Sequence, residues 1–255
     1  MEQDKITCEQ ILTSLEPHNN KSTAELVVLT GKLLLNSPYK EHTLEASPEH
    51  LIINMREFDC TTFAENCLAI ARAAKSKKPG FEEFTRQLQL IRYRDGRIEG
   101  YPSRLHYFSD WITNNDRKRT VNSLSKTINQ IPFDKTINFM SQHPQSYSAL
   151  NGNVVFLQTI IKQENALTKS PLYFIPTEKI NELKHLLKNG DIFGITTNIE
   201  GLDIIHAGIV LFKENELHFM HASSSAEKVI ISETPLYDYL VNRKTATGIM
   251  VARPL

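Results

Sequence analysis

The sequence predicts an α+β fold, in which helices come first and an antiparallel sheet follows. Two observations support this prediction. In the N-terminal half, apolar residues recur at the three- and four-residue spacing of helices. After the segment "TEKINELKHLL", short runs rich in β-branched residues are separated by turn residues. A group of helices followed by a group of strands favours an α+β arrangement over alternating helices and strands.

The individual elements follow from the same patterns. Ser22 and Glu25 form the capping-box spacing at the start of a helix, and "KNG" after residue 187 is a typical helix end. The segment "NSPYKEHTLEASPEH" contains two prolines and is expected to be a loop. The predicted helices cover residues 5–16, 22–36, 60–75, 148–167 and 177–187, and residues 81–94 form a helix or a helix that passes into a strand. The predicted strands cover residues 191–197, 204–212, 216–223, 228–233 and 248–255.

The composition limits the class of protein. Lys plus Arg and Asp plus Glu both number 29 among 255 residues, so the zero net charge gives no indication of nucleic acid or of an anionic membrane as a partner. No apolar run approaches about 18 residues, so no membrane span is expected. The polar start of the chain lacks the apolar core of a signal peptide. Either the protein stays in the cytoplasm or the chain begins after a removed signal.

Cys60 lies at the start of the helix predicted in "REFDCTTFAENCLAIARAAK". Asp59 is a favourable N-cap residue, and Thr62 with Glu65 resembles a capping box. In the first turn, the helix dipole and the unpaired N–H groups favour a thiolate over a thiol. Cys67 lies two turns deeper on the apolar face, and about 10 Å of helical rise excludes a disulfide with Cys60. On this evidence Cys60 is either a nucleophile or a small core residue.

Three of the nine histidines, His206, His218 and His221, lie in one predicted hairpin. A turn at residues 213–215 brings His206 nearly opposite His221, within one residue and at about 5 Å across the strands. His218 is an odd number of residues from His221 and therefore points to the other face. The pair is consistent with three interpretations: two ligands of a metal site without an evident third, two hydrogen-bonded structural side chains, or a base and its orienting group for a cysteine nucleophile.

Four stretches, in this order, resemble the NlpC-type, papain-like cell-wall hydrolases: "FDCTTFAE", "LKNGDIFGITT", "HAGIVLF" and "FMHASS". The resemblance implies that Cys60 is the nucleophile, that His206 is the base and that His221 orients the base. "NSPYKEHTLE" resembles the segment that carries a tyrosine beside the nucleophile, which implies a role for Tyr39 in positioning the nucleophile or stabilising the oxyanion. The usual glycines around that tyrosine are missing here, and two threonines follow Cys60 where the family has Ser-Gly.

A narrower resemblance is to the N-acetylmuramoyl-L-alanine amidases that act on anhydro-muropeptides, a branch formerly catalogued as a domain of unknown function. "DCTTFAE", "SRLHYFSDWI" and "INFMSQHPQSYSAL" carry this resemblance, which runs from about residue 30 to the C-terminus. It implies one papain-like catalytic domain over residues 1–255, with an elaboration at about 95–185 that forms the substrate cleft. It also implies cleavage of the lactyl–L-Ala amide of peptidoglycan fragments without a metal or organic cofactor, by a monomer in the periplasm or cell envelope.

The segment "SRLHYFSDWI" is expected to supply contacts with the substrate. Tyr107 and Trp111 offer flat apolar faces, Arg104 can bind a carboxylate bidentately, and His106 lies between them in the sequence. The alternative is an aromatic core segment with a surface arginine. Asp59 is a further candidate, because the endopeptidases of the superfamily use the corresponding aspartate to hold a free L-Ala amine.

Three other functions stay open. An endopeptidase that cuts the D-Glu–diamino acid bond of the stem peptide would use the same catalytic residues. A catalytically inactive wall-binding module is disfavoured by the intact Cys60, His206 and His221. A lipid-modifying acyltransferase or thioesterase on the same fold would be expected to carry an apolar anchor segment, and the sequence has none.

Overall fold

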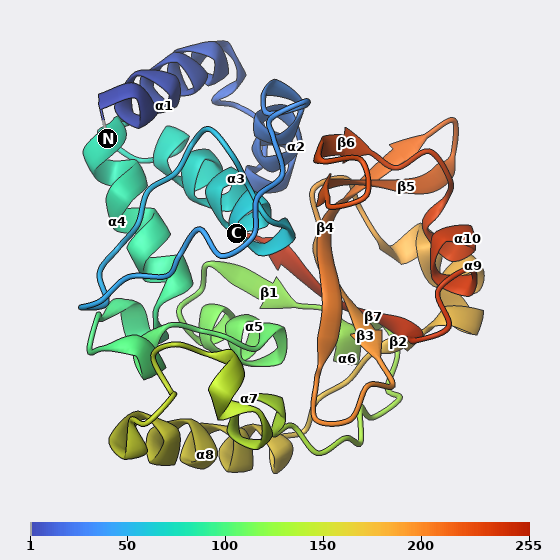
Figure 1. Cartoon of the computed structure of the whole chain (residues 1–255). Helices are drawn as coiled ribbons and strands as arrows, with labels where there is room; N and C mark the ends of the chain where they lie inside the picture. Colours follow the sequence, from blue (N-terminus) through green and yellow to red (C-terminus); the bar gives the residue numbers. More distant parts are fainter. Residues whose placement is uncertain (1) are drawn as a thin grey trace.

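The computed structural model describes residues 2–255 and combines helices with one antiparallel sheet (Figure 1). Its strand order is β1-β7-β3-β4-β5-β6, and β2 pairs with β7 outside this order. The strands are β1 (Val121–Ser123), β2 (Ile175–Pro176), β3 (Ile192–Thr197), β4 (Ile204–Lys213), β5 (Glu216–Ser223), β6 (Lys228–Ile231) and β7 (Ala246–Pro254). The α-helices are α1 (Glu2–Leu15), α2 (Thr23–Leu33), α3 (Cys60–Ala74), α4 (Phe81–Arg92), α5 (Phe108–Arg117), α6 (Ser125–Ile128), α7 (Phe139–Gln142), α8 (Val154–Thr168), α9 (Ile180–Leu183) and α10 (Leu236–Val241). The predicted α+β class is confirmed.

The elements that the sequence predicts are largely present. All five predicted strands form, as β3 to β7, and the predicted helices appear as α1 to α4 and α8. The segment 177–187 is not one helix, because short 3-10 turns flank the four-residue α9. The structure adds β1, β2, α5, α6, α7 and α10, which the sequence patterns did not reveal.

The sheet is buried on both faces, because its strands send alternate apolar side chains into two cores. Ile209 of β4 packs in the core that contains residues of α1 to α4, whereas the next residue, Val210, packs in a second core with Leu236 and Leu240 of α10. Figure 1 shows α1 to α4 on one side of the sheet and α9 and α10 on the other. Helix α3 packs directly against β4 and β5, so its first residue, Cys60, is held beside the strands that carry the two histidines.

Residues 95–185, the expected elaboration, contain two strands of the main sheet. Val121 of β1 pairs with Pro254, and Ile175 of β2 pairs with Ile249. Other residues of this segment form a third apolar cluster around Tyr101, Tyr107, Ile137, Met140, Leu150, Ile160 and Leu167. The segment therefore completes the sheet as well as adding a layer beside it.

The hairpin register differs slightly from the expected one. β4 and β5 pair Ile209 with Met220, and the ladder continues to Lys213 opposite Glu216. Extended toward the start of β4, this register brings His206 level with Ser223, two residues beyond His221. The two histidines are therefore diagonal neighbours on the same face of the hairpin, a separation that long side chains can span.

Candidate active site

Cys60 is the first residue of α3, and Asp59 is its N-cap. The Asp59 carboxylate accepts a hydrogen bond from the Thr62 N–H at 2.7 Å, and the Thr62 hydroxyl accepts one from the Asp59 N–H at 2.9 Å. The capping box thus joins Asp59 to Thr62. Glu65, the expected partner of Thr62, instead forms an ion pair with Arg92 at 2.7 Å.

The expected thiolate at Cys60 is contradicted by its surroundings. Cys60 is half-buried, and burial, with the nearby Asp59 charge as the second cause, raises the pKa of its thiol to about 11. Hydrogen bonds that include the backbone N–H of Ala207 oppose this rise but do not cancel it. Among the three cysteines, Cys8 and Cys67 have no exposed surface, so Cys60 is the one that solvent reaches.

His206 and His221 form a direct contact. Nε2 of His206 and Nδ1 of His221 are 2.7 Å apart, and the two rings are nearly perpendicular, at 89°. Burial, followed by the charges of His221 and Arg243, lowers the pKa of His206 to about 3. Burial and then Arg243 lower the pKa of His221 to about 4. Both imidazoles are therefore neutral at pH 7. His218 bonds elsewhere, with its Nδ1 3.0 Å from the Ser232 carbonyl oxygen.

The sequence did not single out Tyr239, which lies against the histidine pair, or Arg243, which lies over the Tyr239 ring. The Tyr239 ring of α10 is 5.9 Å from the His221 ring and 6.5 Å from the His206 ring, between centroids. The Arg243 guanidinium lies 4.2 Å from the Tyr239 ring centroid and donates a hydrogen bond to its hydroxyl at 2.5 Å. A tyrosine and an arginine four residues apart near a helix are too common to mark a site without the fold.

Tyr39 precedes Cys60 in the sequence, whereas the two histidines follow it, and Tyr39 lies near Cys60 in space. It forms a parallel bridge with Phe58, and its backbone N–H donates to the Glu227 carbonyl at 2.9 Å. Its half-buried ring packs against the first core, beside Cys60. Burial raises the pKa of the Tyr39 hydroxyl, and the Cys60 charge adds to the rise, so the phenol stays protonated at neutral pH.

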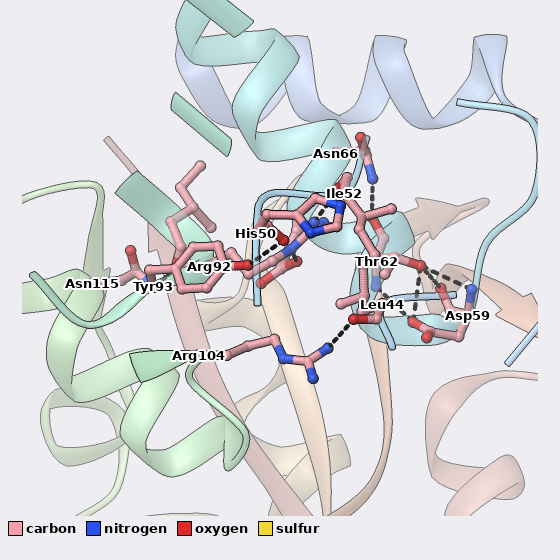
Figure 2. Close-up of polar contacts among 12 residues, drawn as sticks. Leu44, His50, Ile52, Asp59, Thr62, Asn66, Arg92, Tyr93, Arg104 and Asn115 are labelled. Atoms are coloured by element: carbon pink, nitrogen blue, oxygen red, sulfur yellow. Dashed lines mark hydrogen bonds and ion pairs between the residues drawn. The ribbon is translucent and has the colours of Figure 1, made fainter. Parts of the chain in front are cut away.

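A cavity of about 420 Å³ opens beside the start of α3. Asp59 and Thr61, which flank Cys60 in the sequence, line it together with Arg104 and His106. Its other lining residues are His42, Thr43, Leu44, Glu45, Glu65, Arg92, Tyr101, Leu105, Ser146, Tyr147 and Ser148. Figure 2 shows that Arg92, Arg104 and the Asp59–Thr62 cap lie around one region. The volume is within the range of small-molecule sites.

Arg104 and His106 are fixed in the cavity wall. Arg104 is only 6% exposed and donates a hydrogen bond to the Leu44 carbonyl at 2.8 Å (Figure 2). It donates a second hydrogen bond to Glu45 at 3.1 Å. Its guanidinium also lies 4.9 Å from the Tyr101 ring centroid. Nε2 of His106 is 3.0 Å from the Tyr101 carbonyl oxygen, and burial, followed by the Arg104 charge, lowers the pKa of His106 to about 3.

Tyr107 and Trp111 are not brought into this cavity. Trp111 is 2% exposed and stacks on Phe108 with centroids 5.4 Å apart. Tyr107 is 6% exposed; its hydroxyl donates to Glu164 at 2.7 Å and accepts from the Met140 N–H at 2.8 Å. The structure therefore agrees with the core alternative for these two rings and does not give them the open faces expected of sugar contacts.

Two further features of residues 2–255 bear on the site. This part of the chain contains no group of three or more His, Cys, Asp or Glu side chains arranged to hold a metal ion. The histidine pair thus has no third ligand of these types. Across the same residues, no helix has both the length and the apolar character needed to cross a membrane.

Comparisons with known proteins give the family. The model of the AmiA-like family, described as N-acetylmuramoyl-L-alanine amidase-like, matches residues 29–249. An N-acetylmuramoyl-L-alanine amidase from Bacteroides uniformis ATCC 8492 is 38% identical, with a TM-score of 0.87, and the match covers 91% of this chain and 98% of that one. A putative xylanase from Bacteroides fragilis is 40% identical, with a TM-score of 0.84, and the match covers 88% of this chain and 98% of that one.

A protein from Legionella pneumophila shares the fold at 22% identity, with a TM-score of 0.73 over 100% of this chain and 95% of that one. No curated protein matches the chain. The family match spans most of the sequence and includes Cys60, His206, His221 and Tyr239. The chain therefore belongs to the AmiA-like family of N-acetylmuramoyl-L-alanine amidase-like proteins.

Proposed function

We propose that this protein is a cysteine-dependent N-acetylmuramoyl-L-alanine amidase of the papain-like, NlpC type. One observation carries the proposal: in a chain of the amidase-like family, half-buried Cys60 begins a helix and faces the N–H of Ala207, the residue next to His206. His206 in turn contacts His221 at 2.7 Å. To these three residues on neighbouring elements we assign the roles of nucleophile (Cys60), base (His206) and orienting group (His221).

The first chemical step follows from the protonation states. Because the pKa of Cys60 is about 11 and that of His206 about 3, the resting pair is a neutral thiol and a neutral imidazole. His206 has one nitrogen, Nε2, engaged with Nδ1 of His221. We assign the hydrogen to Nε2, which donates it to His221, so that Nδ1 of His206 is free to accept the thiol proton as sulfur attacks the amide carbonyl.

The second step breaks the amide bond. Attack by the Cys60 sulfur makes a tetrahedral oxyanion, for which the backbone N–H of Cys60 and the protonated phenol of Tyr39 are the donors we assign. When the C–N bond breaks, the proton on Nδ1 of His206 moves to the leaving L-Ala nitrogen. A thioester remains. Water then attacks it and gives a proton to His206, which returns it to the departing thiol, and the muramoyl carboxylic acid is released.

The substrate we propose is the lactyl–L-Ala amide of a muropeptide, with the 1,6-anhydro sugar preferred. The ring available to the sugar is that of half-buried Tyr147, which lines the cavity, whereas Tyr101, Tyr107 and Trp111 are buried. Asp59 keeps the stem-peptide endopeptidase as the second candidate, because its carboxylate also lines the cavity and could hold a free amine. Since the substrate is a peptidoglycan fragment, we propose that the enzyme acts in the cell envelope, in peptidoglycan turnover or recycling, and as one catalytic domain.

Mass spectrometry of a digested disaccharide anhydro-muropeptide tests this proposal. An amidase releases the free disaccharide and an intact peptide that begins with L-Ala. An endopeptidase instead leaves L-Ala on the sugar, or releases an L-Ala-D-Glu dipeptide from a free stem. The Cys60→Ala variant is the control and should form neither product. Turnover by that variant would refute the cysteine mechanism whichever bond is cut.

A further inference from the structure

The position of the cavity relative to the histidines indicates which half of the substrate it can hold. Asp59 and Thr61 line it on either side of the nucleophile, whereas His206 and His221 do not line it at all within residues 2–255. In the mechanism above, the leaving amine must receive its proton from His206. The amine half of the substrate therefore lies on the histidine side of Cys60, and the acyl half lies toward the cavity.

Arg92 gives this cavity a hydrogen-bond donor without an acceptor. It is the last residue of α4 and is 1% exposed. Its Nε donates to Glu65 at 2.7 Å, and its Nη1 donates to the Ile52 carbonyl at 2.6 Å (Figure 2). The third nitrogen, Nη2, is buried and has no partner in the structure. A buried donor without an acceptor is costly, and Arg92 lines the cavity, so a ligand there can supply the acceptor.

The charges around Arg92 favour a neutral oxygen over a carboxylate. Glu65 compensates the Arg92 charge at 2.7 Å. Glu45 and Glu49 lie 3.1 and 3.5 Å from the Arg104 guanidinium. Asp59 adds a further acidic group to the wall. Each arginine is already paired with an acid, so the cavity offers a bound carboxylate no uncompensated positive charge. A carbonyl oxygen needs only a hydrogen-bond donor, which Arg92 supplies.

We propose that this cavity binds the muramoyl half of the substrate and that Nη2 of Arg92 donates to a neutral oxygen of the sugar, the acetamido carbonyl. The inference rests on the proposed function and extends it, because it names the acyl-side contact that selects an N-acetylated sugar. Among the neutral oxygens of the muramoyl group, an amide carbonyl is a stronger acceptor than an ether. Arg92 is thereby a specificity-determining residue rather than part of the proton-transfer machinery.

Binding measurements on the Cys60→Ala protein separate this inference from the proposed function. Calorimetry compares 1,6-anhydro-N-acetylmuramoyl-L-alanine with an analogue whose acetamido group is replaced by a hydroxyl. Loss of a charged hydrogen bond is expected to weaken binding by about 10- to 100-fold. Arg92→Lys keeps a cation for Glu65 but removes Nη2. In the protein that carries both Cys60→Ala and Arg92→Lys, the acetamido ligand should therefore bind about 10- to 100-fold more weakly than in the Cys60→Ala protein. The hydroxyl analogue should change less than about threefold, since it never made the bond.

Arg94→Lys is the matched control, because Arg94 forms its ion pair with Asp110 and does not line this cavity. It should leave both affinities unchanged. Equal losses for both ligands in Arg92→Lys would overturn the inference and reduce Arg92 to packing between α3 and α4. So would equal affinities of the two ligands for the Cys60→Ala protein itself, a result that does not depend on the folding of any Arg92 variant. The inference would also be overturned if the binding of a stem peptide that ends in a carboxylate depended on Arg92 while the binding of the sugar did not.

The proposed function has its own readout in the same experiment. Wild-type enzyme that fails to cleave 1,6-anhydro-N-acetylmuramoyl-L-alanine, while the Cys60→Ala protein binds it with the expected dependence on Arg92, would refute the amidase and leave the sugar site standing. Cleavage by the wild-type enzyme, with binding that does not depend on Arg92, would support the amidase and refute the sugar site. Absence of both binding and cleavage would refute both.

Discussion

At the scale of single residues, Cys60 is held as a thiol by two effects of unequal size. Burial is the larger one, and the negative charge of Asp59 adds to it; together they raise the pKa of Cys60 to about 11. A helix N-terminus by itself favours the thiolate, but here it acts on a side chain that has lost much of its contact with water. In the proposed mechanism the base therefore removes the proton during attack, because little thiolate exists beforehand.

Asp59→Asn should lower the pKa of Cys60. Asparagine is as good an N-cap as aspartate, so the start of α3 is kept while the charge that disfavours the thiolate is removed. We expect faster carbamidomethylation of Cys60 by iodoacetamide at a fixed pH near 8, measured by peptide mapping across a pH series. Asp59→Ala, which also removes the cap, should in addition cost about 1 kcal/mol of stability. An unchanged alkylation curve in Asp59→Asn would mean that burial alone sets the pKa.

The two histidines should differ under mutation. His206→Ala removes the group that accepts and returns the proton, and the loss of such a group typically costs about 10²- to 10⁴-fold in rate. His221→Ala removes only the partner that fixes the His206 tautomer through the 2.7 Å contact, so its loss in kcat should be smaller. Steady-state kinetics on a muropeptide measures both. A larger loss in His221→Ala than in His206→Ala would reverse the assigned roles.

The sequence could predict Cys60 and the histidine pair because their positions depend on local rules. A capping residue predicts the start of a helix, and a turn between two segments of strand periodicity predicts a hairpin. The same sequence could not tell whether Trp111 faces a cleft or a core, since both put an aromatic ring at the same helical spacing. Its stacking on Phe108 depends on which elements pack on α5. The family resemblance indicated a role for the motif as a whole but not the direction in which each of its side chains points.

At the scale of elements, the short helix α10 and the residue Arg243 that follows it contribute to the electrostatics of the site. Arg243 follows α10 and lies over the Tyr239 ring. Burial is the largest cause that lowers the pKa of both His206 and His221, and the charge of Arg243 lowers both values further. A positive charge disfavours a second positive charge nearby, so Arg243 adds to the effect of burial, which is the main reason why both imidazoles are neutral. The rings of His221 and Tyr239 face the His206 ring, and the charge of Arg243 acts on it.

Arg243→Gln should move the acid limb of kcat/KM to higher pH. With the arginine charge removed, the pKa of His206 rises, and the base becomes protonated, and so inactive, at a higher pH than in the wild type. Arg243→Lys keeps the charge and should leave the limb where it is. Because Arg243 is exposed, high salt should screen it and shift the wild-type limb in the same direction. The pH profile at low and high salt measures both effects, and an unmoved limb in Arg243→Gln would exclude this role.

The strands were the most predictable elements and α10 the least. β3 to β7 have continuous apolar runs bounded by turns, and these runs are visible because both faces of the sheet are buried. α10 spans only Leu236–Val241, which is too short for a helical period to repeat. β1 and β2 are three and two residues long, and pairing with β7 rather than their own sequence makes them strands.

At the scale of the whole molecule, one close approach joins the helical layer to the sheet. Gly190 has φ +88° and lies between the 3-10 turn after α9 and β3. Its N–H donates to the Val210 carbonyl of β4 at 2.9 Å. A Cβ at this position would lie 2.0 Å from the Ala24 carbonyl oxygen of α2. Two constraints therefore act at this glycine: a left-handed backbone and a contact with another backbone that cannot move aside without shifting α2.

Gly190→Ala should destabilise the whole protein more than a left-handed alanine alone. The left-handed conformation costs about 1–2 kcal/mol, and the clash with α2 adds a packing penalty of about 1–3 kcal/mol, for a total of about 3 kcal/mol. Gly152→Ala is the matched control, because Gly152 has φ +78° and nothing within 4 Å of its Cβ position. It should lose only the backbone part. Chemical denaturation of both variants measures the difference, and equal losses would show that α2 moves away at little cost and that this contact does not fix the helical layer on the sheet.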